Sequence, residues 1–200
     1  MRIVAGAWRG RQLRAPAGKD TRPTADRVRQ ALFDMLMHAP WGGRSVVEDA
    51  VVLDAFAGTG ALGLEALSRG ARFAMFFERD PEALKALTAN VAGCGAGDRC
   101  TVVQRDALRA ERGAGHRGGH RNQPHGKAFE PASLVFLDPP YSRGLVPAAL
   151  AHLMAESLVA PNALIVAETG RDETWLPEQP LLEERIHGAA RLIVFRTGAA

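Results

Sequence analysis

Residues 51–65 read Val-Val-Leu-Asp-Ala-Phe-Ala-Gly-Thr-Gly-Ala-Leu-Gly-Leu-Glu, and this stretch decides the predicted fold class. Its apolar, β-branched start at 51–55 predicts a buried strand, and Gly58 and Gly60 predict a tight turn. The apolar residues from Ala61 onward predict a helix that begins directly after the turn. A strand, a glycine-rich turn and a helix in this order are how α/β proteins hold an adenosine-containing cofactor.

The rest of the chain continues this alternation of short apolar runs with helical ones. Further strands are expected at 73–78, 101–104, 134–138 and 164–168, and helices at 61–69, at 82–92 and in the stretch that ends near Leu158. Such alternation predicts a parallel sheet covered by helices on both faces. Two last strand-like runs, 181–187 and 191–196, flank Gly188 and predict an antiparallel hairpin at one edge. The expected fold class is α/β and Rossmann-like.

The glycine spacing G-x-G-x-x-G at 58–63 matches the dinucleotide fingerprint, so NAD is one candidate cofactor. Glu78 ends the next strand, 20 positions after the first glycine, where a carboxylate can accept both hydroxyls of an adenosine ribose. Asp54 argues against NAD, because it would repel a pyrophosphate bound at the helix start. S-adenosylmethionine carries an ammonium and a sulfonium instead, and both favour a nearby acid. The pattern therefore favours S-adenosylmethionine, with Asp106 placed to meet the adenine amino group.

The motif Asp138-Pro139-Pro140-Tyr141 follows the fourth predicted strand and is the second informative pattern. An amino group on a nucleobase is a poor nucleophile, because its lone pair is delocalised into the ring. The Asp138 carboxylate and the Pro139 carbonyl can each accept one N–H of such a group, which favours a pyramidal nitrogen and its developing positive charge. The prolines keep the backbone rigid, and Tyr141 offers a face for stacking a base. Both patterns together predict a nucleobase N-methyltransferase.

Positive charge is concentrated at the N-terminus. Residues 1–30 hold eight basic and two acidic side chains, whereas the other 170 residues hold 17 basic and 20 acidic ones. A basic end on a slightly acidic body favours a polyanionic partner, most simply nucleic acid. The alternative is that these arginines only make an exposed terminus soluble.

The N-terminal residues are expected to form an extension of the main domain. Residues 2–15 predict a short hairpin, and Arg22-Pro23-Thr24 predicts the start of a helix with Thr24 as its cap. An apolar stripe would dock that helix on the core, whereas Arg27 and Arg29 lie off the stripe and would face outward; the stripe consists of Val28, Ala31, Leu32, Met35 and Leu36. We therefore expect a basic extension over 1–40 and a methyltransferase domain over 41–200.

Some features of the chain point to no chemistry. Residues 111–128 are glycine-rich and basic, and they predict a flexible loop in which three histidines lack a rigid setting for a metal ion. Cys94 and Cys100 have neither redox nor ligand spacing, and we expect them to pack near a helix end and a strand start. Without a signal peptide or a long apolar run, we expect a soluble, cytoplasmic protein.

Two N-terminal stretches carry a resemblance to a known family. They read Arg2-Ile3-Val4-Ala5-Gly6-Ala7-Trp8-Arg9-Gly10-Arg11 and Arg22-Pro23-Thr24-Ala25-Asp26-Arg27-Val28-Arg29, the latter followed by Leu32-Phe33. Together with residues 54–70 and the Asp-Pro-Pro-Tyr motif, they resemble the bacterial small-subunit ribosomal RNA guanine-N2 methyltransferases of the RsmD type. The resemblance covers most of the chain, and the two N-terminal stretches are its most specific part.

This resemblance implies a class I methyltransferase fold with seven strands and a small N-terminal hairpin. It also implies S-adenosylmethionine as the cofactor. The implied substrate is one guanine of the small-subunit (16S) RNA in a partly assembled subunit. The cofactor residues it implies are Asp54, Ala55, Phe56, Gly58, Thr59, Gly60, Glu78, Arg79, Asp106 and Ala107. The implied catalytic residues are Asp138, Pro139, Pro140 and Tyr141. The implied RNA contacts are Arg2, Trp8, Arg9, Arg11, Arg22, Thr24, Arg27 and Arg29. The insertion at 111–128 departs from the family pattern, because it is longer and more basic.

Two alternatives stay open. The Asp-Pro-Pro-Tyr motif does not separate guanine N2 from adenine N6 or cytosine N4, and that choice rests on the resemblance alone. A non-catalytic RNA-binding assembly module with a vestigial cofactor turn is a hypothesis of a different class. The intact acids Asp54, Glu78 and Asp138 argue against it, because a retired site has no reason to keep three costly carboxylates. We expect a monomer that uses no metal ion.

Overall fold

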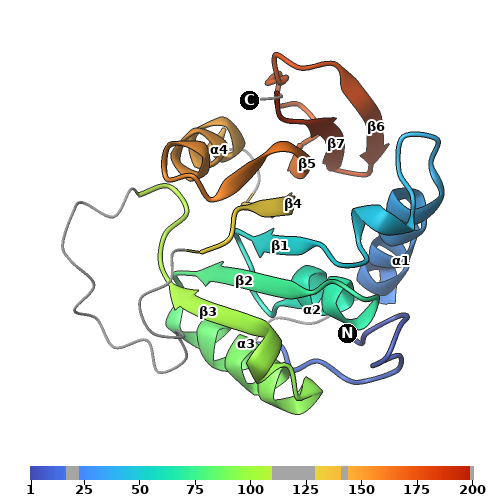
Figure 1. Ribbon diagram of the computed structural model, residues 1–200, viewed down its shortest axis with the longest axis vertical. Helices are drawn as coiled ribbons and strands as arrows, with labels where there is room; N and C mark the ends of the chain where they lie inside the picture. Colours follow the sequence, from blue (N-terminus) through green and yellow to red (C-terminus); the bar gives the residue numbers. More distant parts are fainter. Residues whose placement is uncertain (17–22, 110–128, 141–143, 199–200) are drawn as a thin grey trace.

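The described residues form one seven-stranded sheet (Figure 1). The computed structural model describes residues 1–16, 23–109, 129–140 and 144–198, with the backbone alone for 23–25. The strand order is β3-β2-β1-β4-β5-β7-β6; β1 to β5 run parallel, and β7 is antiparallel to both of its neighbours. The strands are β1 Val51–Asp54, β2 Phe73–Glu78, β3 Cys100–Gln104, β4 Ala132–Leu137, β5 Val159–Gly170, β6 Leu181–His187 and β7 Ala190–Arg196.

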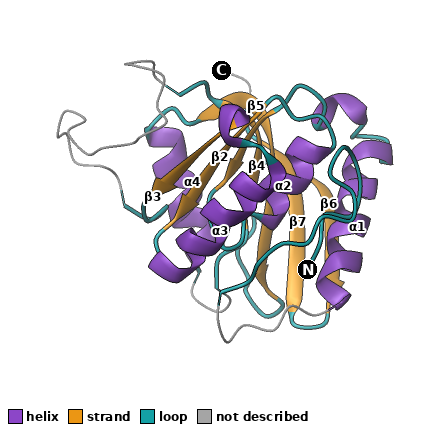
Figure 2. Ribbon diagram, turned by 90° about the horizontal axis from the view of Figure 1, so that it is seen from below, coloured by secondary structure: helices purple, strands orange, loops and turns teal. Residues whose placement is uncertain are grey.

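Helices cover both faces of this sheet, as Figures 1 and 2 show. On one face, apolar side chains of three helices pack against Phe76 and Phe136; these helices are α1 (Pro23–His38), α2 (Ala61–Ser68) and α3 (Pro81–Cys94). On the other face, α4 (Leu145–Ala155) packs against Val135 and Ile165. The side chains of β1 alternate between the two apolar clusters, which explains why β1 is buried at every position. Two short 3₁₀ turns, η1 (Arg44–Val46) and η2 (Gly97–Arg99), complete the elements.

The predicted strands and helices are confirmed to within a few residues at most of their ends. β2 and β6 have the predicted bounds, whereas β5 begins earlier than predicted, at Val159, and ends at Gly170. β4 ends at Leu137, so Asp138 follows the strand instead of closing it. Cys94 ends α3 and Cys100 starts β3, both buried, as expected.

The N-terminal residues form the expected short hairpin. An antiparallel bridge joins Arg2 to Gln12, and the Ile3 N–H donates to the Arg11 carbonyl at 2.9 Å. The buried side chains of Ile3 and Leu13 belong to the same apolar cluster as α1 and the sheet. The division of the chain at residue 40 stays a prediction.

Two details of the prediction for α1 are wrong. Val28 does not join the apolar stripe, because 42 % of its surface is exposed. Arg29 does not face outward, because only 5 % of its surface is exposed and its guanidinium pairs with Asp26 at 3.0 Å. Buried acids compensate the arginine charge, so this position can point inward despite its type. The helix begins at Pro23, so Thr24 is its second residue and not its cap as predicted; the Thr24 side chain lies outside the described residues.

The expected loop at 111–128, with its three histidines, also lies outside the described residues. Of the helices that the structure describes, none is long and apolar enough to span a bilayer.

Candidate active site at the carboxyl ends of the strands

Two carboxylates follow neighbouring parallel strands at the same edge of the sheet. Asp54 ends β1 and is paired in register with Phe136 of β4, so Asp138 lies only two residues further along β4's direction. The Ala55 N–H donates to the Phe136 carbonyl at 3.1 Å and ties the chain after β1 to β4. From β1 the sheet extends to β2 and β3 on one side and to β4 and β5 on the other. This is the topological switch point, where open α/β sheets bind their ligands.

Close packing requires glycine at two positions, one in the turn between β1 and α2 and one in the first turn of α2. Gly60 has a φ of 79°, in the left-handed region, and a Cβ there would overlap the Leu87 side chain. A Cβ on Gly63 would overlap the ring of Phe76, so its absence lets α2 pack closely on β2. A Cβ on Gly58, in contrast, would meet no described atom within 4 Å. The space above the turn is therefore open to a ligand.

Asp54 lies beneath this turn, with 2 % of its surface exposed. Its Oδ2 accepts the Gly63 N–H at 3.1 Å, which satisfies a donor that the first turn of α2 leaves unpaired. Burial raises the pKa of Asp54 to about 7; the Gly63 N–H opposes this rise, and the charge of Glu78 adds to it. A cation bound over the turn would stabilise the ionised form of this acid.

Glu78, at the end of β2, holds the turn from the other side. Its Oε2 accepts the Gly58 N–H at 2.8 Å, and its Oε1 accepts the Asp80 N–H at 2.7 Å. Each carboxylate oxygen can accept more than one hydrogen bond, so these contacts leave capacity for ligand hydroxyls. Glu78 therefore lies where the sequence predicts a ribose acceptor, beside the open face of the turn.

Asp106 lies two residues beyond β3, next along the same edge of the sheet. It accepts hydrogen bonds from Arg79 Nη1 and from the Leu108 N–H, both at 3.0 Å. Burial by itself would raise the pKa of Asp106, but these hydrogen bonds and the charges of Arg79 and Arg109 outweigh it and lower the pKa. The predicted cofactor residues Arg79 and Asp106 thus form an ion pair, 56 % and 21 % exposed.

The remaining predicted cofactor residues also line this edge. Ala55 and Ala107 are buried, whereas Phe56, Gly58 and Thr59 are half-buried. Ala57 joins the turn to β2, because its N–H donates to the Phe77 carbonyl at 3.0 Å. All ten predicted residues come from the ends of β1, β2 and β3 or from the loops that follow them.

The tip that follows β4 presents Asp138 and Pro140 to solvent and buries Pro139. Although the Asp138 side chain is open to water, the surrounding protein displaces part of its solvent and raises its pKa, and the nearby charges of Glu168 and Asp54 add to the rise. Three acids from β1, β4 and β5 therefore share one space at the edge of the sheet. Tyr141 lies outside the described residues.

The predicted RNA contacts lie partly on an exposed surface. Arg2, Arg9 and Arg27 are exposed, and Arg2 and Arg9 line a hollow of about 310 Å³ together with Gln30. Arg11 is exposed but donates to the Gly93 carbonyl. Trp8 is only half-buried, and the Arg99 guanidinium lies 4.9 Å from its ring centroid. Arg22 and the Thr24 side chain lie outside the described residues.

Arg29 is a correction within this set, because it points into the protein. Its Nε lies 3.5 Å from Glu65 of α2, and its Nη2 donates to the Arg2 carbonyl. Glu65 is fully buried and also accepts the N–H groups of Val4 and Ala5 at 2.8 and 3.0 Å. Arg29 therefore helps to hold the extension in place and is not available to a ligand. Sequence reasoning missed the role of Glu65, although a charged residue among the apolar positions of α2 was a usable signal.

Asn90 of α3 is a second residue that sequence reasoning missed. Its Nδ2 donates to the carbonyls of Thr59 at 2.9 Å and Arg14 at 3.0 Å, and its Oδ1 accepts the Arg14 N–H at 2.7 Å. This buried amide joins the glycine turn directly to the end of the N-terminal hairpin. The cofactor turn and the basic extension are therefore parts of one hydrogen-bonded structure.

Known proteins are similar to this chain both in sequence and in fold. Residues 1–196 match the protein family described as Conserved hypothetical protein 95. The chain is 40 % identical to the ribosomal RNA small subunit methyltransferase D of Escherichia coli over 182 residues. The aligned residues cover 90 % of this chain and 79 % of that protein. The chain belongs to the small subunit methyltransferase D family. The resemblance seen in the sequence is confirmed.

Solved structures share the fold over the whole length of this chain. The solved structure of yhhF from Escherichia coli is 34 % identical, has a TM-score of 0.77, and covers 100 % of this chain and 99 % of that one. An RNA methyltransferase from Salinibacter ruber, solved in complex with S-adenosyl-L-homocysteine, is 17 % identical and has a TM-score of 0.57. The match covers 91 % of this chain and 95 % of that one. This distant likeness concerns the fold alone. The expected class I methyltransferase fold, with its antiparallel C-terminal hairpin, is confirmed.

Proposed function

We propose that this chain methylates the exocyclic N2 of a guanine in small-subunit ribosomal RNA, with S-adenosylmethionine as methyl donor. One observation carries the proposal: β1 pairs with β4, which brings the open glycine turn and Asp54 beside the Asp138-Pro139 tip. The Escherichia coli relative named as a ribosomal RNA small subunit methyltransferase supports the substrate class.

The residues at the edge of the sheet fit the proposed cofactor. Asp54 lies under the turn as an acid that a nearby cation would ionise, which suits the ammonium and the sulfonium. Glu78 would accept the ribose hydroxyls and Asp106 the adenine amino group, because they follow the two neighbouring strands in that order. S-adenosylmethionine supplies a methyl group on a positively charged sulfur.

At the tip, the chain's own groups would act on the base. The Asp138 carboxylate and the Pro139 carbonyl would each accept one N–H of the N2 amino group and favour a pyramidal nitrogen. The nitrogen gains a methyl group and must release one proton. The raised pKa of Asp138 makes its carboxylate a better proton acceptor than an ordinary aspartate. Positioning would supply much of the remaining rate.

The basic extension would hold the RNA. Arg2 and Arg9 line one hollow beside α1, and hydrogen bonds to Glu65 and Asn90 fix the extension to the elements of the cofactor site. Phosphate contacts of this kind set the register of an RNA without reading its sequence. The target base would have to leave its stack to reach the tip. We further propose that the chain acts as a monomer on a partly assembled subunit.

Replacement of the tip carboxylate tests this function. We expect Asp138→Ala to lower kcat by about 1,000-fold, because it removes both the N–H acceptor and the proton acceptor. Cofactor affinity in calorimetry should stay within a few-fold of the wild-type value. Transfer of labelled methyl groups to small subunits from a strain that lacks this chain provides the readout.

Asp98→Ala, which removes a carboxylate of η2, is the matched control and should leave kcat unchanged. Near wild-type turnover of Asp138→Ala would remove this residue from the mechanism. Mass mapping of the methylated RNA identifies the nucleotide and the modified nitrogen. A product on adenine N6 or cytosine N4 would refute the guanine assignment, and no binding of S-adenosylmethionine would favour a non-catalytic module.

A further inference from the structure

One polar side chain lies on the buried face of α3. Asn90 has 3 % of its surface exposed, and the other buried residues of this helix are apolar: Ala83, Ala86, Leu87, Val91 and Cys94. An amide in such surroundings is costly unless its hydrogen bonds are made. Leu87 lies one helical turn before Asn90, and its side chain is the atom group that a Cβ on Gly60 would overlap. This face of α3 therefore packs directly on the glycine turn.

The Asn90 amide joins two segments that are distant in sequence. It donates to the Thr59 carbonyl in the turn, and it bonds both the N–H and the carbonyl of Arg14 at the end of the hairpin. A donor and an acceptor about 3.6 Å apart no longer form a hydrogen bond, so all three bonds exist only at a fixed spacing of turn and hairpin. Displacement of either segment would leave a buried polar group without its partner, which is costly.

A weaker contact supports the same connection. Thr59 Oγ1 lies 3.5 Å from the sulfur of Met1, and the Met1 carbonyl accepts the Leu13 N–H of the hairpin at 3.0 Å. A thioether sulfur is a weak acceptor, so the amide of Asn90 makes the stronger link. Thr59 is thus tied to the extension through its backbone and through its side chain.

The hairpin continues from Arg14 to the hollow in which the RNA contacts are proposed. The bridge between Arg2 and Gln12 joins its two sides. The described lining residues of the hollow include Arg2 and Arg9 and no acid. The segment that Asn90 holds is therefore the same segment that presents cations to RNA phosphates.

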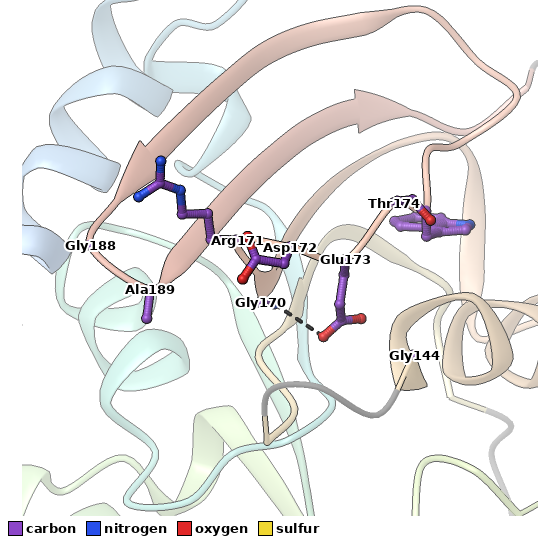
Figure 3. A pocket seen from close by; sticks show the side chains of 9 residues that line it. Gly144, Gly170, Arg171, Asp172, Glu173, Thr174, Gly188 and Ala189 are labelled. Atoms are coloured by element: carbon purple, nitrogen blue, oxygen red, sulfur yellow. Dashed lines mark hydrogen bonds between the residues drawn. The ribbon is translucent and has the colours of Figure 1, made fainter.

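A larger cleft, of about 830 Å³, follows the end of β5, and its charge is less suited to RNA (Figure 3). Among its described lining residues are one basic side chain, Arg171, and two acidic ones, Asp172 and Glu173. A surface with an excess of acids disfavours a polyanion. The hollow on the extension is therefore the better surface for RNA.

We propose that Asn90 couples the two sites, so that cofactor at the glycine turn raises the affinity for RNA and RNA raises the affinity for cofactor. The inference rests on the proposed function and adds the residue through which its two ligands act on each other. A cofactor that contacts the turn holds Thr59 in place, and Asn90 then holds Arg14 and the hairpin, so RNA pays a smaller entropic cost on binding. The reverse effect has the same size, because coupling between two binding sites is reciprocal. Asn90 touches neither ligand and is a positioning residue.

Binding of each ligand, measured with and without the other, tests this coupling. S-adenosylhomocysteine serves as the cofactor probe, because it lacks the methyl group and leaves the RNA unmodified. At saturation it should raise the affinity of the wild-type protein for small-subunit RNA by about 5- to 50-fold, a usual size for coupled sites. RNA should raise the affinity for S-adenosylhomocysteine by the same factor. Filter binding and calorimetry provide the two measurements.

Asn90→Ala should reduce this coupling factor to about twofold or less, because the link between Thr59 and Arg14 is lost. The matched control is Ser68→Ala. Ser68 Oγ accepts the Trp8 N–H at 2.9 Å and donates to the Ala5 carbonyl at 2.6 Å, so it also holds the extension, but neither bond reaches the turn. Ser68→Ala should weaken RNA binding equally with and without S-adenosylhomocysteine and keep the wild-type coupling factor.

A thermal melt checks the fold of each variant. If Asn90→Ala unfolds, Asn90→Asp takes its place; it keeps an acceptor for the Arg14 N–H, lacks the donor to Thr59, and should lose the coupling likewise. Independent binding of the two ligands to the wild-type protein overturns the inference, as does a wild-type coupling factor in the folded Asn90 variant or a lost one in Ser68→Ala. These results leave the proposed function intact, whereas a wild-type protein that transfers no methyl group from S-adenosylmethionine to RNA overturns the proposed function itself.

Discussion

At the scale of single residues, Asp54 combines a cost in stability with a proposed role in cofactor binding. Its pKa is raised to about 7 in the folded protein, mainly by burial. Protonation therefore favours the folded state: this stabilisation is complete below the unfolded pKa near 3.8 and is lost as the pH rises through 7. The protein keeps an acid that is costly at neutral pH, which is typical of a functional site.

We predict that Asp54→Asn stabilises the protein at pH 8 by about 2–4 kcal/mol, because the amide keeps the Gly63 hydrogen bond without a buried charge. The gain should shrink toward zero below about pH 4, near the unfolded pKa of Asp54. Thermal melts across this pH range provide the measurement, and calorimetry should find weaker binding of S-adenosylmethionine.

Asp106→Asn is the control, because its expected effect on stability at pH 8 has the opposite sign. The pKa of Asp106 is lowered, so its stabilisation is present above the unfolded pKa and is lost as the pH falls through the folded one. This variant should melt below the wild-type protein at pH 8 and equal it at strongly acidic pH. An Asp54→Asn variant that is less stable than wild type at pH 8 would contradict the account of Asp54.

At the scale of elements, α2 is the piece that joins the cofactor turn to the N-terminal extension. Glu65 accepts two N–H groups of the extension and pairs with Arg69 at 2.8 Å, while Ser68 Oγ accepts the Trp8 N–H at 2.9 Å. The start of α2 therefore adjoins the open glycine turn, and its polar face contacts the extension. Loss of the Glu65 charge would remove the fully buried acid that pairs with two buried arginines, Arg29 and Arg69.

We predict that Glu65→Gln lowers the free energy of unfolding by about 3 kcal/mol, since breaking a buried ion pair leaves an uncompensated charge. Urea unfolding measures this loss, and hydrogen exchange at Val4 and Ala5 should accelerate. Glu48→Gln is the matched control, because its pair with Arg44 is exposed; it should change stability by less than about 0.5 kcal/mol. Equal losses in both variants would refute a special role for Glu65.

At the scale of the whole molecule, charge is divided between a basic extension and a slightly acidic body. Arg9 and Arg27 are exposed, and neither pairs with an acid among the described residues that would compete with RNA. Contacts between cations and phosphates release counterions, so their number sets the salt dependence of binding.

We predict that Arg9→Glu with Arg27→Glu weakens binding to small-subunit RNA at least tenfold at low salt and reduces the slope of log K against log salt by about two. Filter binding across a salt series measures both quantities. The control Lys85→Glu reverses an exposed cation on α3 and should leave the slope unchanged. A double variant with the wild-type slope would assign these arginines to solubility alone.

Most of the sheet could be predicted because local patterns specify it. The apolar runs of β1, β2 and β4 are too short for helices and carry β-branched or aromatic residues, and the glycines after β1 indicate a tight turn. Arg29, in contrast, could not be placed correctly. The helical period predicts the side of the helix on which a residue lies, but it does not predict that a buried acid on another element can pair with it. The position of the loop after β5 escaped prediction for the same reason: Arg191, which donates to the Glu173 carbonyl, is distant from it in sequence.

The sequence by itself determined the α/β class, the glycine turn, the row of acids at strand ends and the family, since each follows from residue types at short spacing. The tertiary structure alone decided which groups share a space: the β1–β4 pairing that joins Asp54 to the tip, the network around Glu65, and the contacts by which Arg191 holds the loop after β5. The reason is physical, because burial and long-range pairing set the electrostatics and the orientation of a side chain, and neither is encoded in its immediate neighbours.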